Sequence, residues 1–343
     1  MTFLVNSNMK LLIFLLLYSP IVYGIDFHTL RSKSSHKTAV QETPFLYNLV
    51  KRQGQRCDIY NDALIRWCGR GLEYCSSPAC QVDFSDSCDG NIRPEGPDTV
   101  NLHRPKIGPV PYGKGIYHCE KYGVIALTYD DGPYEYTSDL LDLLKKYDAK
   151  ATFFVTGRNL GKGAINNRDL PWRNLIKRMV ADGHQVASHT WSHQRLTQIS
   201  DSQLSNQIIY NEIAFADILG YFPTYIRPPY SSSNERVDSK LGDLGYHVTY
   251  FNLDTEGYLH NSAEEIQRSK DIWDDGVEGK DSTMTKWLGI EHDPVYQSVY
   301  NLTEYMLRSM RRNGFKSVTV GECLEDPKKN WYRSVDNVDG KSS

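Results

Sequence analysis

Two adjacent carboxylates stand at the end of an apolar stretch of strand length. The stretch 123–127 runs into 128–133, where Asp130 and Asp131 precede a Gly–Pro pair that turns the backbone. Acids at the end of a buried strand need a positive partner. Because neighbouring side chains point in different directions, one acid can bind a cation while the other stays free as a base. The alternative is an ordinary turn, which Asp-Asp-Gly-Pro also suits.

Two histidines follow another short apolar stretch, 185–188. His189 and His193 are four residues apart, and this spacing predicts both imidazoles on one face of a helical turn, where they suit a single metal ion. Together with Asp131 they would give three protein ligands and leave an open position for water. For the histidines alone, a polar surface or a hydrogen-bonded core pair is the alternative.

Three further polar clusters also end strand-like stretches. Arg227 precedes two prolines that fix an extended backbone, and it is suited to hold a carboxylate in a two-pronged ion pair. A salt bridge in a structural loop is the alternative for this arginine. The stretch 250–258 ends with a carboxylate and an aromatic residue, and 287–293 ends with His292, a candidate general acid.

Elements of two kinds must position these residues, and they alternate from residue 116 onward. We expect strands at 124–128, 151–156, 185–188, 225–227, 247–252, 287–291 and 317–320, and helices at 137–147, 172–181, 200–219, 237–244, 263–273 and 295–313. Strands separated by such helices imply parallel pairing with right-handed crossovers. About seven units fit a closed barrel better than an open sheet, although spacing alone leaves both open.

Length and charge limit the class of protein. A chain of 343 residues, 40% of them hydrophobic, can bury one sizeable core and carry a small extra module. A net charge near −3 offers no basic face, so we expect no nucleic-acid partner. We expect a monomer.

The N-terminus predicts secretion. Lys10 followed by the apolar run 11–18 is typical of a signal peptide, here residues 1–24, and the run is too short to span a bilayer. A buried N-terminal helix is the alternative. No second apolar run is present, so we expect a secreted protein, extracellular or in the cell wall, with no membrane span. The glycosylation sequon at Asn301 agrees with secretion.

Seven cysteines in a secreted chain predict disulfides, and their odd number leaves one unpaired or joined to another molecule. A bridge between Cys119 and Cys323 would tie the first and last strands of one domain. We also expect Cys80 and Cys88 to form disulfides, although the pairing within their region is open.

The cysteines and prolines also suggest domain limits. Residues 25–56 should be a flexible lead-in, 57–90 a small stapled module, 91–115 a stiff proline-rich linker and 326–343 a C-terminal tail.

The stapled module resembles the second half of a hevein-like chitin-binding domain, in a degenerate form. The resemblance rests on the stretch 67–75 and on Cys80 and Cys88. It implies a sugar-stacking platform formed by Trp67, Tyr74 and Phe84. A module that serves only as a spacer is the alternative.

The five polar clusters, taken in order over residues 116–325, resemble the motifs of the polysaccharide deacetylases of carbohydrate esterase family four. Within that family the likeness is greatest to the fungal chitin deacetylases. The resemblance implies an α/β fold, a distorted (β/α)7 barrel, here preceded by the small disulfide-rich module. It also implies a divalent metal, zinc with cobalt as an alternative, and chitin or another N-acetylglucosamine polysaccharide as the substrate.

The resemblance assigns roles to nine residues. Asp130 would be the general base, Arg227 would orient it, and His292 would be the general acid; Asp131, His189 and His193 would bind the metal; the Tyr230 backbone N–H would stabilise the oxyanion, and Tyr230, Tyr258 and Trp287 would contact the sugar.

One position departs from the family pattern. The family's fourth motif ends in an acid that tunes the catalytic histidine, whereas Gly257 precedes Tyr258 here. Glu256 or Asp254 would have to substitute, because without a carboxylate the protonated His292 is less favoured.

Three other functions stay open. The protein could be a non-catalytic chitin-binding protein, or a deacetylase of peptidoglycan or acetylxylan. A glycoside hydrolase using Asp130 and Glu256 is also conceivable, but it leaves both histidines and Arg227 without a role.

Overall fold

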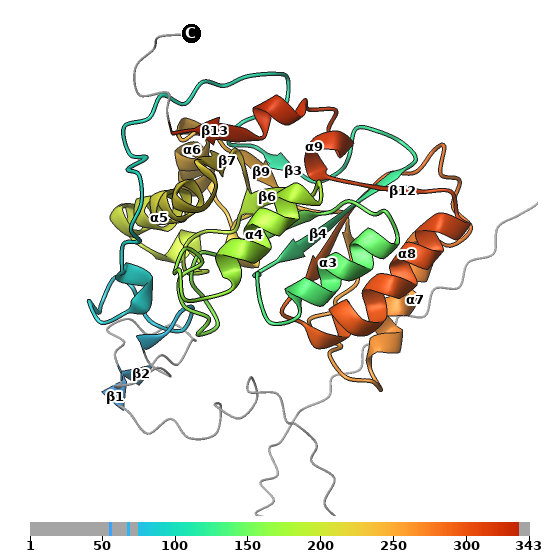
Figure 1. Ribbon diagram of the computed structural model, residues 1–343, viewed down its shortest axis with the longest axis horizontal. Coiled ribbons are helices and arrows are strands. Elements are labelled where there is room, and N and C mark those ends of the chain that lie inside the picture. The colour runs from blue at the N-terminus through green and yellow to red at the C-terminus, as the bar shows by residue number, and fades with distance from the viewer. Residues whose placement is uncertain (1–54, 57–66, 69–74, 336–343) are drawn as a thin grey trace, which may run out of the picture. The chain divides into compact units, whose positions relative to one another are not determined.

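The computed structural model describes residues 55–56, 67–68 and 75–335 (Figure 1). The predicted signal peptide, the lead-in up to residue 54 and Tyr74 lie outside the described residues. Trp67 is described only through the backbone of a two-residue strand, β2 (Trp67–Cys68), which pairs antiparallel with β1 (Gln55–Arg56). Among the described residues no helix combines the length and the apolar character needed to cross a bilayer.

The fold is built on a parallel sheet with β4 (Val124–Asp130) near its centre. From edge to edge the sheet runs β10 (Leu253–Asp254), β11 (Trp287–His292), β4, β5 (Thr152–Val155), β6 (Gln185–Ser188), β8 (Tyr225–Ile226), β9 (His247–Thr249) and β3 (Gly115–Ile116), while β12 (Lys316–Val318) pairs with the first part of β4. The sheet curls into a half-barrel, and its edge strands β3 and β10 are not paired with each other in the described chain. The predicted α/β architecture of a distorted (β/α) barrel is thus confirmed.

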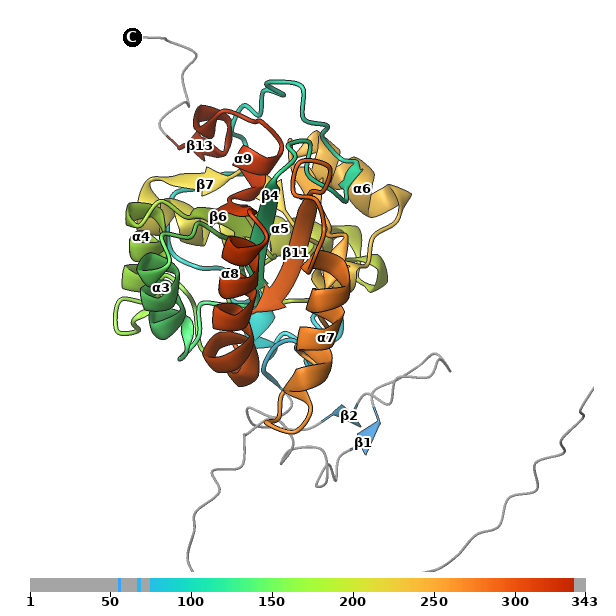
Figure 2. The ribbon, with the colours of Figure 1, turned by 90° about the vertical axis from the view of Figure 1, so that its right-hand side faces the viewer.

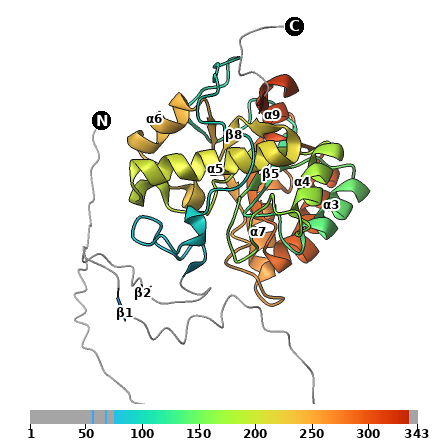
Figure 3. The same ribbon diagram turned by 60° about the vertical axis from the view of Figure 1, so that its left-hand side comes forward.

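Helices follow the strands along the chain, as expected for parallel pairing. They are α3 (Thr137–Lys146), α4 (Trp172–Ala181), α5 (Asp201–Leu219), α6 (Glu235–Asp243), α7 (Ile266–Val277) and α8 (Thr303–Arg312). Helices α7 and α8 lie over β11 and β4 (Figure 2), whereas α5 lies beside α4 (Figure 3). The predicted helix at 295–313 begins instead as a π-helical turn, η4 (Ser298–Leu302), and the predicted strand at 247–252 ends at Thr249.

Alternation along β4 sends its side chains to two different environments. Ile125, Leu127 and Tyr129 belong to the core beneath the helices, which includes buried residues of α3, α4, α7 and α8. Val124 and Ala126 belong to a second core inside the curl of the sheet. Because successive side chains of a strand point to opposite faces, Asp130 also points inside. The strand therefore carries a carboxylate into the interior.

The segment predicted as a stiff linker, 91–115, is bound to the barrel instead. Arg104 forms an ion pair with Glu212 of α5 at 2.7 Å, and both side chains are almost fully buried. The Thr99 hydroxyl donates to the same carboxylate. A buried glutamate requires such partners, since an unpaired charge in the interior is costly. The linker prediction is therefore wrong, because proline content carries no information about a distant acidic partner.

The chain beyond residue 325 is also part of the fold up to the end of the described residues. Trp331 is buried, and β13 (Tyr332–Ser334) pairs antiparallel with β7 (Tyr221–Pro223). Residues 326–335 of the predicted C-terminal tail thus belong to the fold, and the rest of that segment lies outside the described residues.

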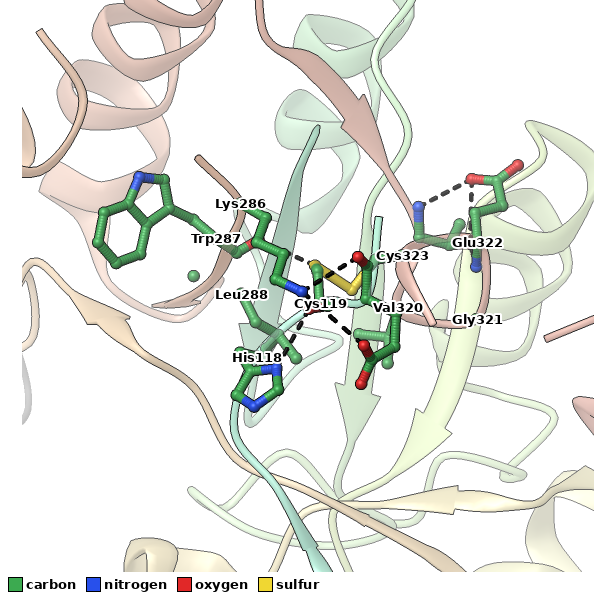
Figure 4. The surroundings of a disulfide bond; sticks show 12 residues. His118, Cys119, Lys286, Trp287, Leu288, Val320, Gly321, Glu322 and Cys323 are labelled. Atoms are coloured by element: carbon green, nitrogen blue, oxygen red, sulfur yellow. Dashed lines mark hydrogen bonds and ion pairs between the residues drawn. A yellow bond between two sulfur atoms is a disulfide. The ribbon is translucent and has the colours of Figure 1, made fainter. Parts of the chain in front are cut away.

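Two disulfides are present among the described residues. Cys119, ahead of β4, is joined to Cys323 in α9 (Val320–Cys323) (Figure 4). Cys80 is joined to Cys88. Cys75 is a free thiol. The first bridge closes 204 residues of chain and ties the start of the sheet to its last elements, as predicted.

We predict that the long-range bridge contributes more to stability than the local one. Chain-entropy arguments give about 5 kcal/mol for a loop of about two hundred residues and about 3 kcal/mol for a loop of about ten residues. The Cys119→Ala/Cys323→Ala double variant should therefore lose more free energy of unfolding than Cys80→Ala/Cys88→Ala, in denaturant unfolding of the oxidised protein. An equal or larger loss in the short-loop control would contradict this prediction.

Candidate metal and catalytic site

A buried ion pair lies at the end of β4. Arg227 Nη1 donates to Asp130 Oδ1 at 2.6 Å, and both side chains are at most 2% exposed. The same nitrogen donates to the Thr128 hydroxyl, while the remaining guanidinium donors reach the carbonyls of Thr249 and Tyr250. The guanidinium also lies over the ring of Phe154, 4.1 Å from its centroid. Arg227 therefore fixes one oxygen of Asp130 and leaves the other to face the site.

Asp131, His189 and His193 form one cluster, with a ligand atom from each within 4.8 Å of the others. His193 Nε2 lies 3.1 Å and His189 Nε2 lies 3.7 Å from Asp131 Oδ1. That buried oxygen accepts no hydrogen bond within the described residues. His189 Nδ1 lies 2.7 Å from the Arg227 carbonyl, and a proton donated there leaves the Nε2 lone pair directed into the cluster. The donor set and the unpartnered oxygen fit a divalent cation.

The protonation states also favour a metal ligand set. Burial lowers the pKa of His193 to about 4, so its imidazole is neutral at pH 7. Burial alone would raise the pKa of Asp131, but the electrostatic influence of the surrounding basic side chains, with His193 and His189 nearest, outweighs it and the pKa is lowered, so Asp131 is a carboxylate at pH 7. A carboxylate and neutral imidazoles are the forms that bind metals.

The two histidines converge for a reason other than the predicted one. No helical turn joins them: residues 189–193 form a loop after β6, in which Thr190 and His193 have φ of 70° and 54°. The buried indole of Trp191 anchors the loop, and its backbone N–H donates to the Gln207 carbonyl of α5. The helical-face argument is therefore wrong, although the pair does meet.

Tyr230 stands at the rim of the cluster. The two prolines before it lead into a short 3-10 turn, η3 (Pro229–Ser231), where Tyr230 has a φ of 60°. Its half-exposed ring lies 4.6 Å from the ring of His193, and the Arg195 guanidinium lies over it. The ring is thus placed beside the candidate metal ligands.

His292 ends β11 in register with Asp130, so the sheet brings the candidate acid and base together. The ring of Tyr258 lies 5.1 Å from the imidazole, and its hydroxyl donates to Asp254. Burial raises the pKa of Asp254, and the nearby His292 partly opposes the shift. His292 Nδ1 is buried and has no hydrogen-bond partner within the described residues.

The structure explains the glycine in the fourth motif. A Cβ at Gly257 would lie 2.6 Å from Ser298 Oγ and 2.7 Å from Glu291 Oε2. The Glu291 carboxylate accepts hydrogen bonds from the hydroxyls of Thr255 and Ser298, and burial raises its pKa to about 7. A buried acid from β11 thus occupies the space beside this loop.

Two sugar-contact predictions fare differently. Tyr258 lies in the site, but Trp287 is wrong: it begins β11 opposite Ile125, whereas His292 at the other end lies opposite Asp130. Five residues of strand span about 17 Å. Figure 4 shows Trp287 in the surroundings of the Cys119–Cys323 bridge instead.

The residues around Phe84 are joined to the barrel. Phe84 is 63% exposed and lies in the Cys80–Cys88 loop. This loop contacts the start of α5, where Asp83 accepts hydrogen bonds from the N–H and hydroxyl of Ser200.

Sequence reasoning missed two buried charged residues beside the Asp131 turn. Lys162 Nζ donates to the carbonyls of Asp131 and Gly132 at 2.9 and 2.8 Å. Asp293, next to His292, accepts from the Thr137 hydroxyl and packs against Gly132. Burial lowers the pKa of Lys162 and raises that of Asp293, while their opposite charges act against both shifts. Asp293 could have been predicted as a site residue because it directly follows a strand. Lys162 lies in an irregular loop, and no sequence pattern indicates its role.

Comparison with known proteins agrees with this geometry. The family model described as polysaccharide deacetylase matches residues 118–249. The chain is 39% identical over 226 residues to a chitin deacetylase of Colletotrichum lindemuthianum, covering 66% of this chain and 89% of that protein. It is 38% identical over 239 residues to a chitin deacetylase of a Pestalotiopsis species, covering 70% and 76%.

A solved structure shares the fold. The structure of the chitin deacetylase from the fungal pathogen Colletotrichum lindemuthianum superposes with a TM-score of 0.61 at 38% identity, covering 65% of this chain and 97% of that one. Fold, site and sequence similarity together lead to one conclusion: the chain belongs to the polysaccharide deacetylases of carbohydrate esterase family four.

Proposed function

We propose that this protein is a secreted, metal-dependent deacetylase that hydrolyses the N-acetyl groups of chitin or chitooligosaccharides to acetate and glucosamine units. Family membership supports a hydrolase that acts on polysaccharides at carbon–nitrogen bonds other than peptide bonds. The main structural support for this proposal is the cluster of Asp131, His189 and His193. A second carboxylate, Asp130, is held beside this cluster by Arg227.

The chain's own residues divide the proton transfers between them. Asp131, His189 and His193 would hold a divalent metal, zinc or alternatively cobalt, which when bound supplies carbonyl polarisation and a water of lowered pKa. Asp130 takes the proton of the water that attacks the N-acetyl carbon. The backbone N–H of Tyr230 stabilises the oxyanion, and His292 protonates the leaving amine as the carbon–nitrogen bond breaks. Acetate and a free sugar amine result.

We also propose that the protein is a monomer and that it acts in the extracellular space or the cell wall. The two disulfides support an oxidising compartment, and residues 1–24 would be the signal peptide. Asn301 would carry a glycan.

A pocket on the same face supports a polymeric substrate. Its volume is about 250 Å³, and its lining residues are Tyr117, Ser231, Ser233, Asp238, Tyr250 and Phe251. Five of these residues follow the ends of β3, β8 and β9, with Ser231 next to Tyr230 in the chain, and Asp238 lies on α6. The exposed ring of Tyr117 can stack on the apolar face of a sugar ring. The serine hydroxyls and the Asp238 carboxylate of the lining can form hydrogen bonds with the hydroxyl groups at the edge of that ring. We assign this pocket to a sugar unit adjoining the one that reacts.

The decisive experiment is acetate release from N-acetylglucosamine oligomers, with and without a chelator. We expect release that chelation abolishes and zinc or cobalt restores. Retention on chitin with no acetate release, even after metal is added, would favour the non-catalytic chitin-binding protein. Faster release from peptidoglycan or acetylxylan would replace the substrate but keep the enzyme class.

The Asp131→Asn and His189→Ala variants should lose metal and activity together. Removing one of three ligands should weaken metal binding by at least about a hundredfold, more than the 10–100-fold cost of losing an outer partner. Metal content after dialysis and acetate release measure the two losses. His103→Ala, an exposed histidine far from the cluster in sequence, is the control. Wild-type acetate release by either ligand variant would sink the site assignment.

The Asp130→Asn variant tests whether Asp130 is the general base or a metal ligand. The amide keeps the shape of the side chain but cannot accept the proton, so kcat should fall about 10²–10⁴-fold while metal content is retained. Arg227 would lose its charge partner, so the melting temperature should be recorded in parallel. Loss of metal in a folded Asp130→Asn protein would show that Asp130 is a ligand instead.

Tyr117→Ala tests the sugar pocket. Loss of ring stacking worth about 1 kcal/mol should raise KM for a tetramer roughly fivefold and leave kcat within about twofold. Tyr122→Ala is a matched control, because that tyrosine is equally exposed (53% against 54%) but precedes β4 at the opposite end of the sheet. Equal KM values for the two variants would remove this pocket from the substrate path.

A further inference from the structure

A buried lysine side chain lies against the turn that presents Asp131. Lys162 follows β5 and is 7% exposed. Its Nζ donates to the carbonyl of Asp131 at 2.9 Å, to the carbonyl of Gly132 at 2.8 Å and to the hydroxyl of Thr156 at 2.9 Å. These three bonds use every hydrogen of the ammonium group. All three donors of the Lys162 side chain are thus used to bind this turn and Thr156, which itself binds the turn.

The position of Lys162 is itself fixed. Its backbone carbonyl accepts from the indole N–H of Trp172 at 2.8 Å, and its N–H donates to the Asn159 carbonyl. The ammonium therefore approaches the turn from a rigid support and is not a mobile side chain that happens to lie nearby.

The turn has a backbone conformation that needs support. Asp131 has a φ of 76°, in the left-handed region that residues with a side chain rarely adopt. Thr156 binds the same two carbonyls, through its hydroxyl and its N–H. Charge-assisted bonds from an ammonium are stronger than these neutral ones. The direction of the Asp131 carboxylate therefore depends on how firmly its own carbonyl and the next are held.

A buried acid packs against the same turn and belongs to the segment of the general acid. The Asp293 carboxylate occupies the space where a side chain at Gly132 would lie, so only glycine fits there. Asp293 is completely buried and follows His292 in the chain. Lys162 and Asp293 thus both act on the same turn, the lysine through its hydrogen bonds to the Asp131 and Gly132 carbonyls and the acid through its contact with Gly132.

We propose that Lys162 is a positioning residue that holds the Asp131–Gly132 turn in its metal-binding geometry, and that Asp293 couples this turn to the His292 segment. The inference rests on the assignment of Asp131 as a metal ligand in the proposed function. It assigns a role to a charged pair that neither the proton transfers nor the ligand set uses.

The test compares metal affinity in the full-length Lys162→Met protein and the wild type, by competition with a chromogenic chelator for zinc. Methionine keeps length and apolar bulk but removes all three donors. We expect the dissociation constant to rise about 10–100-fold, as for lost outer partners of metal ligands. At saturating zinc, kcat for acetate release should still be reduced and KM should stay within about twofold, because no substrate contact changes.

Lys150→Met is the matched control. Lys150 also donates to a backbone carbonyl, that of Asp182 at 2.7 Å, but it precedes β5 at the other end of the strand. Its loss should leave the zinc dissociation constant unchanged even if it lowers the melting temperature. Lys162→Gln restores two donors without the charge, so it should recover part of the affinity and serves as the deciding variant if Lys162→Met does not fold.

The coupling to Asp293 is tested with Asp293→Asn. If the two groups act together, the double variant should lose less zinc affinity than the product of the two single losses. A Lys162 variant that folds and binds zinc within twofold of the wild type would overturn the positioning role, and strictly multiplicative losses would overturn the coupling. A wild-type protein that binds no divalent metal would instead overturn the proposed function, and this inference with it.

Discussion

The ion pair between Arg227 and Asp130 is the constraint on which the site depends. A buried guanidinium is tolerable here because each of its three nitrogens donates a hydrogen bond, to Asp130 and Thr128 and to the carbonyls of two residues at the end of β9. Its own carbonyl receives His189, so the same residue orients the candidate base and one candidate ligand. Breaking a buried pair of this kind costs about 3–5 kcal/mol, which links the integrity of the site to that of the fold.

Three loops around this pair contain residues with left-handed backbone conformations. Asp131, His193 and Tyr230 have φ of 76°, 54° and 60°. Each such residue costs on the order of 1 kcal/mol or more, and it persists only where packing over-determines the backbone. Here the loops are anchored by buried groups, such as Trp191 after β6. Two of these positions, Asp131 and His193, carry side chains that meet in the candidate metal cluster.

The site residues that end a strand could be predicted from the sequence. The carboxyl ends of parallel strands lie at the same edge of a sheet, so the polar side chains there must lie close together. Asp130 and His292 are of this kind. The conformation of the loops could not be predicted from the sequence. His193 approaches His189 through an irregular loop and not through a helical turn. Trp287 was misplaced because a residue that opens a strand lies a full strand length from one that ends it. Lys162 had no local pattern, since its partners are carbonyls far along the chain.

Gly257 illustrates how a motif can depart from its family pattern without losing a buried acid. Glu291 and Ser298 leave no room for a side chain at position 257, and the Glu291 carboxylate is already bonded to Thr255 of the same loop. As the neighbour of His292 on β11, Glu291 must point to the opposite face, so it shapes the loop and does not touch the imidazole. That loop also carries Asp254, whose charge interacts with His292. The missing acid is therefore an argument for a rearranged support of the histidine, not by itself an argument against hydrolysis.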